Sequence, residues 1–237
     1  MSTETLITVQ NLGVYFNTRK SLFRHERIEA LKDVSFSINR GDSFGVIGRN
    51  GAGKTTLLRL LGGIILPDKG RIVNNKATTA LLALQVGFDP ELSGRVNAIL
   101  SGMLLGFRRH EVEANLHKII EFSELGSFIE KPVKSYSSGM SARLGFSVAI
   151  EMCPDVLLID EVLAVGDIDF REKSIAVMCE KLKSDQTIVL VSHDANTVKT
   201  FCNRAVWIEE GVSQLEGESE KVVEAYESYL SVRKIKN

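Results

Sequence analysis

The feature that most constrains this chain is a glycine-rich segment placed between an apolar run and a helix-forming run. Residues 48–55 read GRNGAGKT, a complete match to the P-loop pattern G-x-x-x-x-G-K-[ST]. Residues 43–47 suit a buried strand, and residues 56–61 have helical composition. Glycines let the backbone direct its N–H groups at phosphate oxygens, and the following helix adds its positive N-terminal end. Because a chance glycine turn lacks these flanks, the segment predicts a phosphate-binding α/β fold.

Each position of this loop has an expected role. Lys54 is expected to reach the β- and γ-phosphates of a nucleotide, and the hydroxyl of Thr55 to ligate Mg²⁺. The residues expected to bind the nucleotide are Gly48, Arg49, Asn50, Gly51, Ala52, Gly53, Lys54, Thr55 and Thr56.

Composition excludes several classes of protein. A formal net charge of −1 over 237 residues gives no basic field for nucleic acid or an anionic membrane surface. No run approaches about 18 consecutive apolar residues, so no membrane-spanning helix is expected, and residues 1–5 carry no secretory signal. The three cysteines form no C-x-x-C pair and the four histidines show no metal-ligand spacing. These observations favour a protein of a reducing compartment that has no nucleic-acid partner.

The order of periodic segments predicts a mixed sheet interrupted by helices. Residues 6–10 and 34–38 alternate apolar and polar side chains, as antiparallel strands with one solvated face do. Residues 17–29 between them are polar and basic, and we expect them to form an extended surface loop. From about residue 92 to residue 152 the pattern turns helical. Further strands are expected at residues 71–73, 156–159, 187–191 and 205–208, and a C-terminal helix at residues 221–230.

An acidic pair follows one of the expected buried strands. Residues 156–159 are four apolar residues ahead of Asp160 and Glu161, which is the Walker B pattern. At the end of the strand, Asp160 is expected to face the Mg²⁺ held by Thr55. Glu161 is placed to polarise an attacking water as a general base. With a P-loop upstream, this interpretation outweighs the alternative of a solvated turn.

A histidine follows the next apolar strand along the chain. His193 comes just after residues 187–191, a strand expected to lie beside the strand that ends at Asp160. Open parallel sheets bind ligands at the carboxyl ends of their strands, so His193 is expected at the same site. We interpret it as a γ-phosphate sensor that orients the attacking water, rather than as a structural histidine.

A second glycine-containing turn opens another helix. Residues 137–140 read SSGM and precede an apolar-periodic helix, which makes their N–H groups a second anion site. Two phosphate sites for one nucleotide make little sense within one chain. They do make sense between two chains, where the P-loop of one subunit and Ser137, Ser138, Gly139 and Met140 of the other enclose the same ATP. Alone, such a tripeptide is usually only a helix cap, and its place between the two nucleotide motifs reverses that expectation.

The order of P-loop, Ser-Gly turn, Walker B pair and histidine resembles the nucleotide-binding subunit of ABC transporters over nearly the whole chain. Three segments are similar to a narrower subfamily that exports capsular polysaccharide, lipopolysaccharide O-antigen or wall teichoic acid. Residues 136–144 (YSSGMSARL) replace the usual Leu-Ser-Gly-Gly-Gln signature, and residues 160–167 (DEVLAVGD) replace the usual Asp-Glu-Pro-Thr-x-x-Leu-Asp. Residues 87–97 (GFDPELSGRVN) are similar to the segment before the helical subdomain.

The resemblance implies further site residues. Ser137 and Gly139 match the signature and would contact the γ-phosphate across the dimer, and Met140 takes the place of the usual glutamine at the cost of a polar contact. Asp167 matches the D-loop that couples the two sites. Phe16 matches the aromatic residue that stacks on adenine, and Tyr15 is the alternative. Gln85 is the one glutamine near the expected Q-loop, where it would contact Mg²⁺ and water.

The resemblance also implies an architecture and partners. We expect an α/β P-loop NTPase core with a mixed sheet, an antiparallel β subdomain at the N-terminus and an inserted helical subdomain at about residues 92–152. Residues 1–237 form one domain in this expectation, with no C-terminal carbohydrate-binding domain. The expected cofactors are ATP and Mg²⁺. The expected assembly is a head-to-tail homodimer at the cytoplasmic face of the cell membrane, under two copies of a separate polytopic membrane subunit that handles the glycan.

Three alternatives compete with this expectation. One is the ATPase of another ABC exporter. Another is a soluble ABC ATPase acting on ribosomes or DNA, but such proteins usually fuse two ATPase halves or insert a long coiled coil, and neither is seen here. The third is a GTPase or kinase; a GTPase needs an Asn-Lys-x-Asp guanine reader, and residues 75–78 read NKAT.

Overall fold

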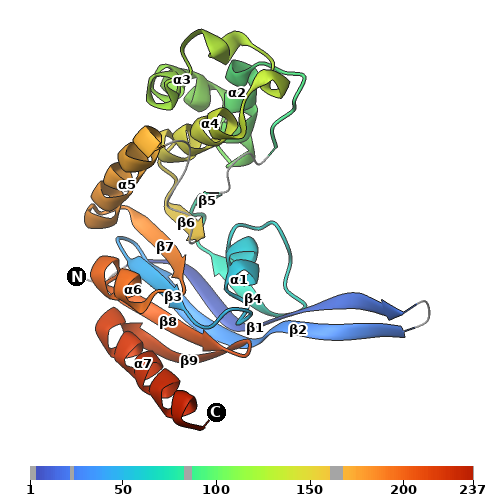
Figure 1. Cartoon of the computed structure of the whole chain (residues 1–237), viewed down its shortest axis with the longest axis vertical. Coiled ribbons are helices and arrows are strands. Elements are labelled where there is room, and N and C mark those ends of the chain that lie inside the picture. The colour runs from blue at the N-terminus through green and yellow to red at the C-terminus, as the bar shows by residue number, and fades with distance from the viewer. Residues whose placement is uncertain (1–3, 22–23, 83–86, 161–167, 237) are drawn as a thin grey trace. The chain divides into compact units, whose positions relative to one another are not determined.

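A computed structural model describes residues 4–21, 24–82, 87–160 and 168–236. The chain divides into two compact units, one formed by Met1–Ala77 with Leu182–Asn237 and the other by Thr78–Lys181 (Figure 1). The P-loop segment belongs to the first unit and the SSGM turn to the second.

The first unit is built on a mixed sheet whose strand order is β4-β1-β2-β9-β8-β3-β7. β1 is antiparallel to β2 and to β4, and β8 is antiparallel to β9. β3 runs parallel to both β7 and β8. The expected combination of antiparallel N-terminal strands and a parallel core is therefore confirmed. The strands are β1 Thr5–Ser21, β2 Arg24–Asn39, β3 Ser43–Ile47, β4 Lys69–Asn74, β7 Thr187–Ser192, β8 Arg204–Glu209 and β9 Val212–Glu218.

The central strands of this sheet are its most buried part. Every residue of β3 and of β7 is buried, as their unbroken apolar runs predicted. The helices described in this unit are α1 Lys54–Leu61, α6 Ala195–Phe201 and α7 Ser219–Lys236. The expected C-terminal helix is confirmed as α7, which packs on β8 and β9 (Figure 1). It buries Val222, Val223 and Tyr226 on one face.

The expectation of a surface loop at residues 17–29 is wrong. Residues 17–21 continue β1 and residues 24–29 belong to β2, with Asn17 paired to Arg27 and Arg19 paired to His25. The resulting hairpin extends past the neighbouring strands (Figure 1). Backbone hydrogen bonds between antiparallel strands do not depend on side-chain polarity, so a polar segment can continue a ladder although it shows no apolar alternation.

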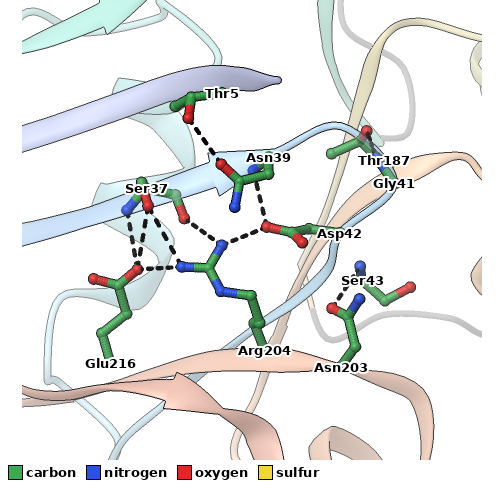
Figure 2. Close-up of polar contacts among 10 residues, drawn as sticks. All are labelled: Thr5, Ser37, Asn39, Gly41, Asp42, Ser43, Thr187, Asn203, Arg204 and Glu216. Carbon is green, nitrogen blue, oxygen red and sulfur yellow. Dashed lines mark hydrogen bonds and ion pairs between the residues drawn. The ribbon is translucent and has the colours of Figure 1, made fainter. Parts of the chain in front are cut away.

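A polar cluster joins four segments of this sheet at the start of β3 (Figure 2). The guanidinium of Arg204 donates to the carboxylates of Asp42 and Glu216, with N–O distances of 2.6 Å each. It also donates to the backbone carbonyl of Ser37 at 3.2 Å. Asp42 accepts from the backbone N–H of Asn39 at 2.8 Å. Because Asp42 is buried, these contacts are what make its charge tolerable, and they tie the turn before β3 to β2, β8 and β9.

The second unit combines a short parallel strand pair with helices. β5 (Thr79–Leu81) pairs with β6 (Val156–Asp160) in parallel. Short 3-10 helices lie at Gly126–Glu130 and Val133–Ser135. The α-helices described here are α2 Gly94–Leu104, α3 Arg109–Ser123, α4 Ser138–Glu151 and α5 Ile168–Lys183.

Helices α2, α3 and α4 share one apolar core. One face of α3 lies in this core, where Val112, Leu116 and Ile119 are buried. Two interhelix aromatic contacts add to the packing, with Phe146 lying 6.0 Å from Phe122 and 5.9 Å from Phe170, measured between ring centroids. The core consists of Ala98, Val112, Leu116, Ile119, Leu125, Ile129, Leu144, Val148 and Met152.

Candidate nucleotide-binding site

The P-loop segment forms a turn between the end of β3 at Ile47 and the start of α1 at Lys54. Gly51 and Gly53 have φ angles of 82° and 99°, in the left-handed region that residues with a Cβ rarely adopt. Gly53 is the N-cap of α1 and supplies no capping side chain. An N-terminus without a capping side chain is the arrangement that binds phosphate at helix N-termini.

Close packing behind the loop also requires glycine. A Cβ on Gly48 would overlap the backbone carbonyl of Ile208 in β8. A Cβ on Gly53 would lie 2.5 Å from the carbonyl oxygen of Ala30 and from a methyl group of Leu31 in β2. The loop is thus pressed against backbone on two sides, which holds its N–H groups in fixed directions.

Lys54 spans the inside of the loop. Its side chain is buried, and its Nζ donates to the carbonyl oxygens of Gly48 at 2.7 Å and Arg49 at 3.0 Å. A buried ammonium among backbone oxygens suits the binding of phosphate, because it brings a positive charge into the loop. Around it, Arg49, Asn50, Gly51 and Thr55 are exposed, Thr56 is half-buried and Ala52 is buried.

His193 lies at the same level of the sheet as the P-loop. Ile47 and Ser192, the last residues of β3 and β7, are partners in the parallel register. Gly48 and His193 therefore follow the ends of two neighbouring strands in the same register. His193 is exposed, and the next residue, Asp194, caps α6 by accepting from the backbone N–H groups of Asn196 and Thr197. The Thr197 hydroxyl and these N–H groups lower the pKa of the Asp194 carboxyl.

Tyr15 and Phe16, the two candidates for stacking on adenine, differ in how far other side chains cover their rings. The guanidinium of Arg27 lies 3.3 Å from the ring centroid of Tyr15, so one face of that ring is already covered. Phe16 is 42% exposed. Both residues follow Val14 in β1, which pairs with Leu31, the β2 residue that borders Gly53.

The signature turn of the second unit caps α4. Ser137 is the N-cap, and its Oγ accepts from the backbone N–H of Met140 at 3.1 Å. This bond uses an oxygen lone pair and leaves the hydroxyl hydrogen as a donor. Ser137 and Ser138 are exposed, and among the described residues a Cβ on Gly139 would meet only the Ser137 Oγ, at 3.7 Å. The turn borders a hollow of about 320 Å³ that Glu124, Leu125, Phe128 and Arg143 also line.

Asp160 is the last residue of β6, half-buried behind four buried residues, as the Walker B pattern predicts for its position. Glu161, Asp167 and Gln85 lie outside the described residues. The P-loop, His193 and the two aromatic residues thus belong to the first unit, and the signature turn and Asp160 belong to the second.

One residue of the site was missed by the sequence reasoning. Glu209, the last residue of β8, is buried, and its carboxylate lies 3.5 Å from the guanidinium of Arg49 in the P-loop. The signal available in the sequence was an acid directly after the apolar run at residues 205–208, which has the same form as the run ending at Asp160.

Comparison with known proteins identifies the family of this chain. The sequence model of the family described as "ABC transporter" matches residues 31–164, which is more than half of the chain. The O-antigen export system ATP-binding protein RfbB of Klebsiella pneumoniae is 46% identical over 210 residues, covering 89% of this chain and 85% of that protein. The teichoic acids export ATP-binding protein TagH of Bacillus cereus is 41% identical over 215 residues, covering 89% of this chain and 39% of that protein.

Solved structures show the same fold. The dimeric post-hydrolysis structure of the ATP-binding cassette MJ0796 bound to ADP and Pi has a TM-score of 0.71 and 20% identity, with 90% of this chain and 99% of that chain covered. An ATP-binding subunit of an ABC transporter has a TM-score of 0.72 and 22% identity, with 93% of each chain covered. No helix within the described ranges is long and apolar enough to cross a membrane. The chain therefore belongs to the ABC transporter family, of which it is an ATP-binding and ATP-hydrolysing member.

Proposed function

We propose that this protein is the ATPase subunit of an exporter that drives a polysaccharide, capsule or lipopolysaccharide O-antigen, across the cytoplasmic membrane. The observation that carries the proposal is the 46% identity to an O-antigen export ATP-binding protein, which spans most of both chains. Teichoic acid export ATP-binding proteins are also similar, with identities of 41%, 43% and 42% for three of them, and this chain spans 76% of the last of these. The higher identity to the O-antigen export protein makes that relative the better guide to the exported polymer.

The nucleotide would be held in the first unit by the P-loop. The N–H groups of residues 48–55 and the Lys54 ammonium bind the phosphates, and the exposed ring of Phe16 stacks on the adenine, because Arg27 covers a face of Tyr15. Thr55 and Asp160 supply the oxygen ligands that suit Mg²⁺, with Gln85 as a further contact. When bound, Mg²⁺ neutralises charge on the transferred phosphoryl group.

The catalytic roles follow the motifs. Glu161 accepts a proton from the attacking water, and His193 orients that water and the γ-phosphate. Support for the second role is the register that places His193 beside Gly48.

The working form would be a homodimer in which two chains enclose ATP head to tail. Ser137, Ser138, Gly139 and Met140 of one subunit face the γ-phosphate bound by the other, and Asp167 couples the two sites. Support comes from the exposure of the Ser137 turn at the N-terminus of α4 and from the dimeric structure of the same fold. Two copies of a separate polytopic membrane subunit complete the exporter, with the ATPase peripheral on the cytoplasmic face.

Deletion and complementation in the native cell test this proposal. We expect deletion to remove a surface polysaccharide and to leave the polymer inside the cell, measured by glycan extraction of surface and cytoplasmic fractions. Complementation with the unaltered chain should restore export. A Lys54→Ala chain and a Glu161→Gln chain should both fail to restore export. The Glu161→Gln chain loses the general base, which typically contributes about 10²–10⁴-fold to the rate of hydrolysis. The Lys54→Ala chain loses a contact with the phosphates.

The two variants should fail for different reasons. The Glu161→Gln chain should bind ATP and accumulate as an ATP-bound dimer, whereas the Lys54→Ala chain should bind nucleotide weakly. An unchanged surface glycan in the deletion strain would contradict polysaccharide export. Unchanged nucleotide affinity in the Lys54→Ala chain would contradict the P-loop assignment.

A further inference from the structure

The carboxylate of Glu209 contacts both the P-loop and the C-terminal helix α7. Its Oε1 lies 3.5 Å from Nη1 of Arg49 in the P-loop and 3.4 Å from Nη1 of Arg233 in α7. The hydroxyl of Tyr229, also in α7, donates to the same oxygen at 3.4 Å. Arg233 in turn donates to the Tyr229 hydroxyl at 2.7 Å. Two elements far apart in the sequence therefore share one acceptor atom.

Because Glu209 is buried, the contacts that Arg49 and Arg233 make with it matter for the free energy of its charge. The Glu209 side chain is only 8% exposed, whereas Arg49 and Arg233 are 46% and 40% exposed. A buried carboxylate is costly unless cations or donors compensate it. Its second oxygen, Oε2, is buried and has no hydrogen-bond partner among the described residues. The charge of Glu209 thus depends on the contacts at Oε1. Without Arg233 the buried carboxylate is under-compensated, and turning it toward water withdraws it from Arg49.

Aromatic packing fixes α7 over the same strand. The Trp207 ring in β8 lies 5.8 Å from the Tyr226 ring and 5.0 Å from the Tyr229 ring, measured between centroids. These contacts hold Tyr229, and with it Arg233, above the end of β8. A movement of α7 would therefore move two of the three groups that compensate Glu209.

Residues on both sides of Glu209, one in β8 and one in the turn after it, also support the P-loop backbone. The carbonyl of Ile208 packs against Gly48, and Gly211 packs against Leu31, the residue that borders Gly53. Arg49 is consequently held twice, by Lys54 at its carbonyl and by Glu209 at its side chain. When phosphate attracts Lys54, the contact with Glu209 still holds the Arg49 side chain.

We propose that Glu209 is a positioning residue for the P-loop, and that α7 sets the nucleotide affinity of the loop through Arg233 and Tyr229. This inference rests on the proposed binding of ATP by the P-loop. Loosening the contact between Glu209 and Arg49 should weaken nucleotide binding, because the affinity of such a loop comes from several backbone N–H groups held in fixed directions. The opposite effect, a stronger pull of a released Arg49 on phosphate, is smaller because that guanidinium is nearly half exposed.

A double-mutant cycle on nucleotide affinity tests the connection. The full chain, an Arg233→Ala chain, an Arg49→Ala chain and the double variant are titrated with a fluorescent ADP derivative. We expect each single variant to raise the dissociation constant about fivefold or more, and the double variant to bind no worse than the Arg49→Ala chain. An Arg233→Lys chain, which keeps the cation, should recover part of the affinity.

A matched control removes a cation from the other end of the same helix. Lys221 pairs with Glu218 on the surface and does not contact Glu209, so the Lys221→Ala chain should bind like the unaltered protein. An unchanged dissociation constant in the Arg233→Ala chain would overturn the proposal. So would an Arg233→Ala substitution that weakens nucleotide binding equally in the unaltered chain and in the Arg49→Ala chain. If the Lys54→Ala chain loses affinity while the Arg233→Ala chain does not, the proposal alone fails; if neither loses affinity, the P-loop assignment fails.

A second measurement needs no substitution. By linkage, a nucleotide that is held more tightly when α7 is docked must also tighten the docking of α7. Backbone hydrogen exchange of α7 in the unaltered protein should therefore slow when ADP is added. Exchange rates in α7 that do not change at saturating ADP would contradict the coupling, whatever the stability of the variants.

Discussion

Gly48, the first glycine of the P-loop, packs directly against the backbone carbonyl of Ile208 in β8. β3 and β8 are parallel neighbours in which Ile47 pairs with Trp207, so the first residue beyond β3 meets the backbone of the adjacent strand. A glycine is needed here for space, while Gly51 and Gly53 are needed for their φ angles.

We expect the Gly48→Ala chain to lose both stability and nucleotide binding. The added methyl group meets backbone, which cannot move aside as a flexible side chain can, and overpacking of this kind costs about 1–3 kcal/mol. Urea unfolding and nucleotide titration measure the two effects. The Gly139→Ala chain is the control for stability, because its Cβ has room and its free energy of unfolding should not fall. Equal stability of the two variants would contradict the close packing.

Gly139 tests the two-chain site. We expect the Gly139→Asp chain to fold normally, because the Cβ has space and an acid in the first turn of α4 suits the positive helix end. The added carboxylate would repel the γ-phosphate presented by a second subunit. The variant should bind ATP as a monomer but form no ATP-dependent dimer, measured by size-exclusion chromatography with light scattering. ATP-dependent dimers as abundant as those of the Gly139→Ala chain would contradict the signature assignment.

The cluster around Arg204 predicts a large loss of stability. The Arg204→Ala chain leaves the buried Asp42 without its cation, and removing one partner of such a pair costs about 3–5 kcal/mol. The free energy of unfolding, measured with urea, should fall by about 3 kcal/mol. As a control, the Arg109→Ala chain breaks an exposed pair with Glu113, for which we expect a loss of about 0.5 kcal/mol or less. Similar losses in the two chains would show that the cluster is not a buried network.

Two cysteines should differ in reactivity. Burial raises the pKa of the Cys202 thiol to about 12, whereas Cys153 is exposed. At pH 8 the thiolate of Cys202 is then only about one part in 10⁴, so a thiol reagent should label Cys153 first and Cys202 only on unfolding. Peptide mass spectrometry after timed alkylation measures this. Equal labelling rates in the native protein would contradict the burial of Cys202.

The raised pKa of the Cys202 thiol also makes the free energy of unfolding depend on pH. A thiol whose pKa is higher in the folded than in the unfolded protein stabilises the fold fully below its unfolded pKa. That contribution is lost as the pH rises towards about 12. The Cys202→Ala chain should therefore lose less stability than the unaltered chain over the alkaline range, measured by urea unfolding at a series of pH values.

Much of the fold could be predicted from local pattern. The P-loop, the buried strands β3, β6 and β7 and the capped helix α4 each follow from a run of adjacent residues, because burial on both faces and helix capping leave signs in nearby sequence. The hairpin at residues 17–29 shows the limit of this reasoning. Its ladder is made by backbone groups, which every residue carries, so its polar side chains indicated a loop instead.

The sequence by itself determined that this chain builds a phosphate-binding loop between a buried strand and a helix. Only the tertiary structure decided what holds that loop: Gly48 on Ile208, and Arg49 linked to Arg233 through Glu209. The loop and the residues that hold it are far apart in the sequence, and neither has a local period or spacing that indicates the other. The energies of these contacts come from burial and charge compensation, which exist only once the strands have packed side by side.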